Sequence, residues 1–408
     1  MESSIYEAVT LIQSGCPTFF KFISANETGE TGGHQCGFYI PREFAEIALG
    51  EPCVKGTNKD ARVKIVWNCN RVTESRIVYY GVGTRNESRI TQFGKGFEYL
   101  QPEYTGALVV FVRTAMYSYS AFVFNSEEET DEFLGTLGLG PADANKLIRL
   151  DGLNMGVREG RAFAKFMKSL SVDFPASDVM SAAARKIENE IYDHEEYIRS
   201  RPDDKLISWS EIEYRLFRAV ENDRYGMLVS KGFPSVDDFI EQANTVLNRR
   251  KSRAGKSLEH HLGALFTGNG IQFEGQIVTE GNKRPDFIFP SSLAYHDQTF
   301  PIEKLVFLAA KTTCKDRWRQ ILNEADRFRG QTKYLCTLQQ GMTIKQMNEM
   351  AAEKVVLVVP QPYVKFYPKK TEMKLITLAH FINLVKEIQS IRGLGVVKGT
   401  IVESVLPR

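Results

Sequence analysis

The sequence predicts two parts of different fold class. The first is a mostly β part, arranged as a barrel or sandwich, and the second is an α/β domain with a mixed central sheet flanked by helices. Residues 1–165 contain short aromatic and β-branched runs with turn residues between several of them. From about residue 176 helical patterns take over, and from about 286 apolar runs alternate with helical patterns. A chain of 408 residues has room for both parts.

Strands dominate the first part. The runs that predict them are FFKFIS (19–24), CGFYIP (36–41), RVKIVWN (62–68), SRIVYYG (75–81), ALVVFVR (107–113) and YSAFVFN (119–125). Short helical patterns intervene, as in EEETDEFLGTLG at 127–138. We take residues 1–165 as one domain on this basis.

The second part begins after a predicted linker at 166–175, where VDFP interrupts the pattern. A helix is predicted to begin at Ser177, and further helical patterns cover 208–228, 234–249 and 256–267. The alternating elements that follow are strands at 286–290, 304–311, 332–338 and 354–360, with helices at about 315–327, 343–353 and 376–389. We take residues 176–408 as one α/β domain.

Composition excludes several classes of protein. The formal net charge is only +2, so a nucleic-acid partner must be argued from local clusters of basic residues. None of the six cysteines forms a C-x-x-C pair, which disfavours a zinc ribbon. The N-terminus lacks a signal peptide pattern, and LVFLAA at 305–310 is too short to cross a bilayer. We therefore expect a cytoplasmic protein with reduced thiols and no membrane contact.

A candidate catalytic centre lies at the ends of two predicted strands. Asp286 precedes the apolar run FIF, and Lys311 ends the apolar run VFLAA. If these strands are neighbours, the two side chains meet at one edge of the sheet. Hydrolysis of a phosphodiester needs such groups, because carboxylates bind Mg²⁺ and a lysine can stabilise charge and orient a water.

A second carboxylate must come from elsewhere, because the position two before Lys311 is Ala309. Glu324 is the candidate, on a predicted helix where 317, 320/321 and 324 share one face. Glu259 is a weaker candidate for an additional acidic role. The plainer interpretation is an α/β domain with ordinary solvated charges.

Two basic segments could contact DNA. Lys315, Asp316 and Arg317 closely follow Lys311, and such side chains can recognise C·G pairs in the major groove. Their alternative role is the charged first turn of a helix. The segment NRRKSRAGK at 248–256 is expected at a helix end or in a loop, where its cations could meet phosphates or simply be solvated. Its cations include Arg249, Arg250, Lys251, Arg253 and Lys256. The string GKS at 255–257 lacks the upstream glycine of a phosphate-binding loop, which excludes an NTPase.

The first domain offers a second candidate DNA surface. Arg85, Glu87 and Arg89 stand at alternate positions, so on a strand they share one face. Tyr39 and His34 could join them, although a histidine in this setting is more often a plain hydrogen-bonded residue. His260 and His261 are read as structural rather than as a metal pair.

At these residues the chain resembles type IIE restriction endonucleases. The resemblance is dense over four segments. They are NRRKSRAGKSLE, VTEGNKRPDF (278–287), AYHD and KTTCKDRWRQILNEAD. In the first domain SANETGETGGHQCGFYIP and TRNESRIT resemble the effector-domain motifs. The resemblance therefore covers both domains.

The resemblance implies a homodimer of restriction-endonuclease-like PD-(D/E)xK catalytic domains, and an N-terminal B3-like pseudobarrel that binds a second, effector copy of the target. It implies Mg²⁺-dependent cleavage of double-stranded DNA at CC(A/T)GG, and autoinhibition by the effector domain. By residue, it implies that Asp286 and Glu324 bind the metal, that Lys311 is catalytic, and that Tyr295 lies at the active site. Lys315, Asp316 and Arg317 match the region that reads the outer C·G pairs.

The chain departs from the family in the effector loop, where Gly83 and Ser88 stand in place of lysines and Phe93 in place of a tryptophan. Fewer cations should weaken phosphate contacts there. Two other functions remain open at this point. One is a sequence-specific DNA-binding protein with an inactive nuclease domain, and the other is a modification-dependent or repair nuclease with the same core.

Overall fold

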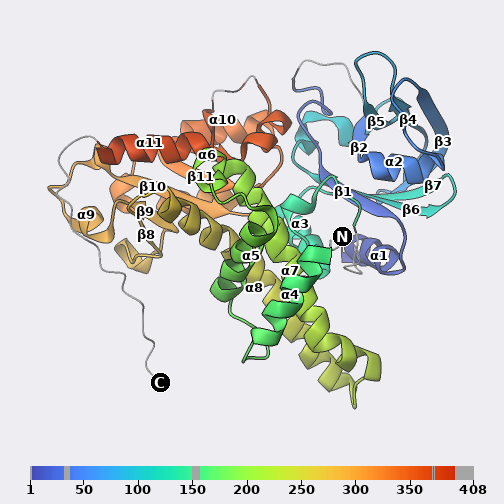
Figure 1. Ribbon diagram of the computed structural model, residues 1–408. Helices are drawn as coiled ribbons and strands as arrows, with labels where there is room; N and C mark the ends of the chain where they lie inside the picture. Colours follow the sequence, from blue (N-terminus) through green and yellow to red (C-terminus); the bar gives the residue numbers. More distant parts are fainter. Residues whose placement is uncertain are drawn as a thin grey trace.

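The computed structural model describes residues 2–31, 37–148, 157–315, 317–369, 371 and 373–390. It contains a sheet in each half of the chain, with long helices between and beneath them (Figure 1). The predicted fold class is confirmed: a curled, mostly β N-terminal part is followed by a mixed sheet with helices on both faces. In the described part of the chain, no helix is both long and apolar enough to span a bilayer.

The N-terminal sheet has seven strands in the order β1-β6-β7-β3-β4-β5-β2. They are β1 (Thr18–Phe22), β2 (Phe38–Ile40), β3 (Asn58–Trp67), β4 (Val72–Tyr80), β5 (Glu87–Thr91), β6 (Leu108–Ala115) and β7 (Ser118–Phe124). Neighbouring strands run antiparallel except β3 and β7, which are parallel. All six strands predicted for this domain are present.

Alternation along β1 gives this sheet two packed faces. Phe19 belongs to an aromatic core with Phe38, Trp67 and Phe111. Phe20 points the other way, into a second core with Phe133 of α3 (Glu127–Leu137). Helix α1 (Glu2–Gln13) shares that second core, and α2 (Arg42–Leu49) packs on the first. This places α3 on the side of the domain that faces the C-terminal half.

The C-terminal sheet has six strands in the order β13-β12-β11-β10-β9-β8. They are β8 (Glu274–Gly275), β9 (Phe287–Phe289), β10 (Val306–Lys311), β11 (Lys333–Thr337), β12 (Val355–Val359) and β13 (Leu375–Thr377). The β10, β11, β12 and β13 strands are parallel, whereas β8 and β9 pair antiparallel. The predicted mixed sheet therefore has its antiparallel part at the edge that carries Asp286.

Residues of β10 alternate between two buried layers. Leu308 and Ala310 pack with α7, α8 and α11, whereas Phe307 and Ala309 pack with the opposite layer around Trp318. Ala309 is fully buried there. A carboxylate at this position would therefore sit inside an apolar core.

Helices complete the C-terminal half. They are α4 (Val157–Ser169), α5 (Ser177–Tyr192), α6 (Tyr197–Ser200), α7 (Pro202–Lys231), α8 (Val236–Gly268), α9 (Ser292–His296), α10 (Ile344–Ala352) and α11 (Leu378–Ser390). The predicted linker at 166–175 overlaps the end of α4, whose Phe163 is buried with residues of α5 and α7. The division of the chain at residue 165 stays a prediction.

Two predictions about helices are wrong. The basic segment at 248–256, which we expected at a helix end or in a loop, lies inside α8, which joins the helical patterns predicted at 234–249 and 256–267 into one helix. The expected α-helix at 315–327 is instead two 3₁₀ helices, η6 (Arg317–Asn323) and η7 (Asp326–Phe328). In η6 the buried Trp318 and Ile321 are three residues apart, as 3₁₀ geometry requires for one face, and Glu324 directly follows the end of η6. The expected α-helical face that was to present Glu324 is therefore absent.

Candidate active site and DNA interface

Asp286 and Lys311 lie together at the edge of the C-terminal sheet. Asp286 directly precedes β9, which pairs with β10 in the register Phe287 to Leu308. The Lys311 ammonium nitrogen lies 3.9 Å from Oδ2 of Asp286. The same oxygen accepts a hydrogen bond of 2.8 Å from the backbone N–H of Ala310. The Asp286 carboxylate is thus fixed by the strand that carries the lysine.

Glu324 approaches the same place from the opposite layer. Its carbonyl oxygen accepts a 2.8 Å hydrogen bond from the Thr279 hydroxyl, which anchors the backbone after η6. Burial raises the pKa of Glu324, the Lys311 ammonium lowers it, and the Asp286 carboxylate raises it further. The charges of both predicted partners therefore act on this carboxyl.

A divalent cation suits these residues. Oε2 of Glu324 is buried and has no hydrogen-bond partner among the described residues. A buried carboxylate oxygen without a partner is costly, and a hard cation would satisfy it. Within the described ranges, no three His, Cys, Asp or Glu side chains already form a metal cluster. Asp286 and Glu324 are the residues that would hold the ion.

Glu259 also reaches this edge, from α8. The side-chain amide of Gln276 donates to Oε2 of Glu259 and to Oδ1 of Asp286, at 3.0 Å each. Burial raises the pKa of Glu259, and the nearby Asp286 charge raises it further. The weaker acidic candidate thus lies close to the stronger ones.

Tyr295 lies in α9, in the layer beside the acidic groups. Its ring is buried, and its hydroxyl donates to Glu280 over 2.7 Å. Glu280 also accepts a 3.3 Å hydrogen bond from the backbone N–H of Asp326, two residues after Glu324. In this structure the tyrosine therefore contacts the backbone after Glu324 both through Glu280 and directly, by accepting a 3.4 Å hydrogen bond from the Arg327 N–H.

The predicted base-reading residues contact the N-terminal domain. The backbone N–H groups of Lys315 and Arg317 each donate to Oε2 of Glu127 over 3.0 Å. The Arg317 guanidinium donates to Oε1 of Glu127 over 2.8 Å, and it pairs with Asp131. Asp316 lies outside the described residues. In this state α3 occupies the groups that we predicted to face DNA.

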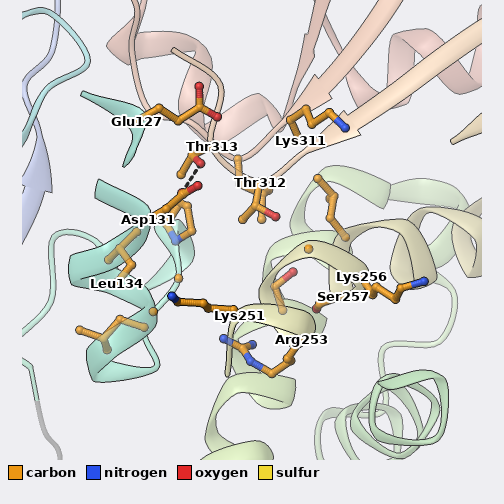
Figure 2. A pocket seen from close by; sticks show the side chains of 18 of the residues that line it. Glu127, Asp131, Leu134, Lys251, Arg253, Lys256, Ser257, Lys311, Thr312 and Thr313 are labelled. Atoms are coloured by element: carbon orange, nitrogen blue, oxygen red, sulfur yellow. Dashed lines mark hydrogen bonds between the residues drawn. The ribbon is translucent and has the colours of Figure 1, made fainter. Parts of the chain in front are cut away.

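A large cavity separates α3 from α8 beside the catalytic lysine. It has a volume of about 1040 Å³ and is lined by α3 on one side and by 251–253 and 255–259 of α8 on the other. Figure 2 shows Asp131 of α3 directed at Thr313, to which it is hydrogen-bonded over 2.5 Å. Lys251 and Lys256 line the same cavity. The cleft beside Lys311 is thus bounded by acidic groups on one wall and basic groups on the other.

The arginines of α8 are largely engaged within the protein. Arg253 is buried and lies over the rings of Tyr214 and Phe217. Arg250 pairs with Glu221 and donates to the carbonyl of Thr136 in α3. The Arg249 guanidinium lies over the Phe174 and Tyr225 rings. DNA contact by these three stays a prediction, and for Arg250 it requires release of a contact with the N-terminal domain.

The structure brings together Tyr39, Glu87 and Arg89 of the predicted N-terminal surface. Arg89 of β5 lies over the Tyr39 ring, with its guanidinium carbon 3.8 Å from the ring centre, and pairs with Glu87 over 3.1 Å. Arg89 is only 5% exposed, so it supports Tyr39 more than it faces solvent here. Arg85 precedes β5 and lies over the Tyr80 ring. His34 lies outside the described residues.

Sequence reasoning missed the residues that hold these groups in place. Glu127 lies in the first turn of a helix that opens with a Ser126–Glu129 capping box, where an acidic residue is ordinary, and Asp131 lies one turn later. Gln276 carried no signal except its place between the helical pattern at 256–267 and PDF. His261 is buried and paired with Glu213 over 2.9 Å, as a structural histidine should be.

Comparison with known proteins decides the family. The chain is 37% identical over 403 residues to the type II restriction enzyme EcoRII of Escherichia coli, covering 91% of this chain and 95% of that protein. Family models match in both halves, "Restriction endonuclease EcoRII, N-terminal" at 13–140 and "EcoRII C terminal" at 217–382. The chain belongs to the EcoRII family. It is therefore a type II restriction endonuclease, a site-specific deoxyribonuclease of the class that depends on divalent metal ions.

Further relatives match less of the chain. The type II restriction enzyme SsoII of Shigella sonnei is 30% identical over 117 residues, which cover 27% of this chain and 37% of that protein. Among solved structures, metal-depleted Ecl18kI in complex with uncleaved, modified DNA is 20% identical, with a TM-score of 0.46 over 59% of this chain and 88% of that one. The EcoRII family membership rests on the EcoRII match and the two family models.

Proposed function

We propose that this EcoRII-family enzyme cleaves double-stranded DNA at a CC(A/T)GG-like site by Mg²⁺-dependent hydrolysis, with Asp286, Lys311 and Glu324 as the catalytic groups. The observation that carries the proposal is the convergence of these groups at one sheet edge, where Lys311 lies 3.9 Å from Asp286 and acts on the pKa of Glu324. Asp286 and Glu324 would hold the cation.

Mg²⁺, when bound, would offset the charge that develops on the attacked phosphate. Asp286 presents oxygens whose direction is set by the Ala310 N–H. Lys311 supplies a positive charge beside them and can orient an attacking water or hold its proton. The apolar layer around Ala309 and Trp318 excludes bulk water from one side of this edge.

The proposal includes a second DNA copy at the N-terminal domain, bound by a surface that contains Tyr39, Arg85, Glu87, Arg89 and the undescribed His34. The enzyme would be autoinhibited until that copy binds. The contacts of Arg317 with Glu127 and Asp131 support this, because the Arg317 guanidinium cannot contact α3 and DNA at the same time. Effector DNA would favour the open state by binding it more tightly.

A homodimer is the third element of the proposal. Two strands must be cut, and the described chain offers one set of catalytic groups. The α7–α8 hairpin ends in exposed apolar side chains, including those of Met227, Val229, Val236 and Phe239. Such a patch is typical of a protein interface, which supports association with a second copy. The described cysteines are all free, which suits a reducing bacterial cytoplasm.

Plasmid digestion tests the proposal directly. Wild type with Mg²⁺ should give discrete fragments whose sequenced ends report the target and the cut position, and Lys311→Ala should give none. Ends scattered over unrelated sequences would refute the proposed site. Cleavage by Lys311→Ala at a rate close to that of wild type would refute the catalytic assignment.

Autoinhibition has its own test. A chain that lacks residues 1–148 keeps α4, whose Phe163 is part of the core with α5 and α7. We expect it to cut a plasmid with a single site faster than the full chain does. If this shortened chain binds the site but cuts it no faster, the N-terminal domain does not inhibit.

A further inference from the structure

Gln276 has an unusual backbone beside the acidic groups. It follows β8 directly and has a φ of +54°, in the left-handed region that side chains with a Cβ rarely adopt. Its N–H lies 3.2 Å from the carbonyl oxygen of Pro285 and 3.3 Å from that of Asp286. The preceding residue, Gly275, is so close to β9 that a Cβ there would lie 3.1 Å from the Asp286 carbonyl oxygen. The turn is thus pressed against the residue that we expect to bind metal.

The strained backbone directs one amide group at two carboxylates. Nε2 of Gln276 lies 3.0 Å from Oε2 of Glu259 and 3.0 Å from Oδ1 of Asp286. An amide nitrogen has two N–H groups, so both are used. The other oxygen of Asp286 accepts from the Ala310 N–H at 2.8 Å. Each Asp286 oxygen therefore accepts one protein hydrogen bond and keeps a second lone pair for another partner.

Without such a donor the two carboxylates would tend to separate. Glu259 comes from α8 and Asp286 from the sheet, so no local chain geometry links them. Like charges repel at short distance, and desolvation strengthens the repulsion. A neutral donor shared between them offsets it while leaving lone pairs for a cation. Unfavourable φ values of this kind persist where the surrounding structure requires them, which often marks a functional site.

We propose that Gln276 is a positioning residue of the metal site, whose amide holds Glu259 and Asp286 together before a cation binds. The inference rests on the proposed metal-dependent hydrolysis. Gln276 itself contacts neither the phosphate nor the ion in this scheme. Its contribution is preorganisation, so its loss should weaken cation binding rather than DNA binding.

The substitution Gln276→Gly separates the effect of losing the amide from an effect on folding stability. Glycine tolerates a φ of +54°, so this change relieves the backbone while it removes both hydrogen bonds. The thermal midpoint of the metal-free protein should stay unchanged or rise. Gln276→Ala also removes the amide but keeps the backbone strain, so its thermal midpoint should be lower than that of Gln276→Gly. A matched control is Asn70→Gly, at an exposed hairpin turn of the N-terminal sheet with a φ of +61°.

Cation affinity is the decisive readout. Calorimetric titration of the full chain with Ca²⁺ should show affinity at least tenfold weaker in both Gln276 variants and unchanged in Asn70→Gly. The Mg²⁺ concentration for half-maximal cleavage should rise by a similar factor. Affinity for target DNA in EDTA should not change.

Two results would overturn the role of Gln276. One is a Ca²⁺ affinity of Gln276→Gly equal to that of wild type. The other is a loss in Gln276→Ala that Gln276→Gly does not share, which would assign the effect to backbone strain. A wild-type protein that binds no Ca²⁺ and cuts no DNA with Mg²⁺ would instead refute the proposed metal site, so the two failures are distinguishable.

Discussion

Glu127 is the residue whose substitution should release the enzyme from its closed state. Its carboxylate accepts from the backbone N–H groups of Lys315 and Arg317 and from the Arg317 guanidinium. All three donors belong to the catalytic domain, whereas Glu127 belongs to α3 of the N-terminal domain. We predict that Glu127→Gln increases cleavage of a plasmid with one site, in the absence of any second DNA copy.

The magnitude follows from these three hydrogen bonds. A hydrogen bond to a charged group contributes about 1.5–3 kcal/mol when buried, but a half-exposed pair contributes about 0.5–1 kcal/mol. The Glu127 side chain is 3% exposed and that of Arg317 is 49% exposed, so the guanidinium contact belongs to the weaker class. Glutamine keeps one acceptor oxygen but loses the charge. We estimate a loss of about 2 kcal/mol from the closed state, which raises the open fraction roughly thirtyfold.

The assay measures the first-order rate of cleavage of the single-site plasmid for wild type, Glu127→Gln and Glu128→Gln. Glu128 is a matched control, because it carries the same charge in the same first turn but is exposed. Glu127→Gln should be faster by up to about thirtyfold, and added effector duplex should stimulate it correspondingly less. If Glu127→Gln and Glu128→Gln cut at the same rate and respond equally to effector duplex, α3 does not restrain the catalytic domain.

Three other substitutions test separate parts of the reasoning. Lys311→Ala should lower the cleavage rate about a thousandfold, because it removes the cation beside the reacting phosphate; filter binding in Ca²⁺ should show target DNA still bound, and lost binding would contradict a purely catalytic role. Burial raises the pKa of Asp143 to about 6, against about 4 in the unfolded chain. Folding stability should therefore fall as the pH rises from about 4 to about 6, because the carboxyl of the unfolded chain ionises first. Asp143→Asn should remove this fall. Its free energy of unfolding, compared with that of wild type, should be about 1–2 kcal/mol larger at pH 8 than at pH 4, allowing for partial exposure. Parallel urea titrations of both proteins that show the same pH profile would refute this prediction. Gly106→Ala should lower the thermal midpoint and increase single-site cleavage. Gly106 has a φ of +83°, and a Cβ there would lie 2.5 Å from the carbonyl oxygen of Gly341 in the other domain. A variant that is neither less stable nor more active would show that the two domains accommodate the extra methyl group without cost.

The sequence predicted the fold class and the main strands because hydrophobic periodicity reports local burial. It also predicted that Asp286 and Lys311 would meet, since each flanks an apolar run and neighbouring strands share an edge. It could not predict the 3₁₀ helix before Glu324. The amphipathic spacing of 317–327 fits an α-helix, and only the packing of Trp318 and Ile321 against β10 selects the tighter turn.

Contacts between domains could not be predicted from local patterns. The Glu127–Arg317 pair joins residues 190 apart, and neither position has a periodicity that signals a partner. The same holds for Gln276, because its proposed positioning role depends on an unfavourable φ and on two carboxylates from different elements. The charge of the α8 arginines left both DNA contact and a solvated surface open, but Arg253 is buried against the rings of Tyr214 and Phe217. Charge in a sequence does not distinguish a cation that faces solvent from one packed on aromatic rings.

Because α3 and DNA would compete for the same donors, the coupling must act in both directions. If loosening the N-terminal domain exposes the loop around Arg317, then DNA bound to that loop must loosen the N-terminal domain by the same free energy. The domain contact contains backbone hydrogen bonds that report this: the Ala25 N–H donates to the Phe366 carbonyl at 3.1 Å, and the Ile344 N–H to Glu30 at 3.2 Å. A target duplex added in EDTA to the full chain should therefore speed hydrogen exchange at both amides, whereas a duplex without the site should do so much less. Unchanged exchange at both amides with the catalytic cleft filled would mean that DNA enters without displacing α3, and the proposed autoinhibition would fail on thermodynamic grounds.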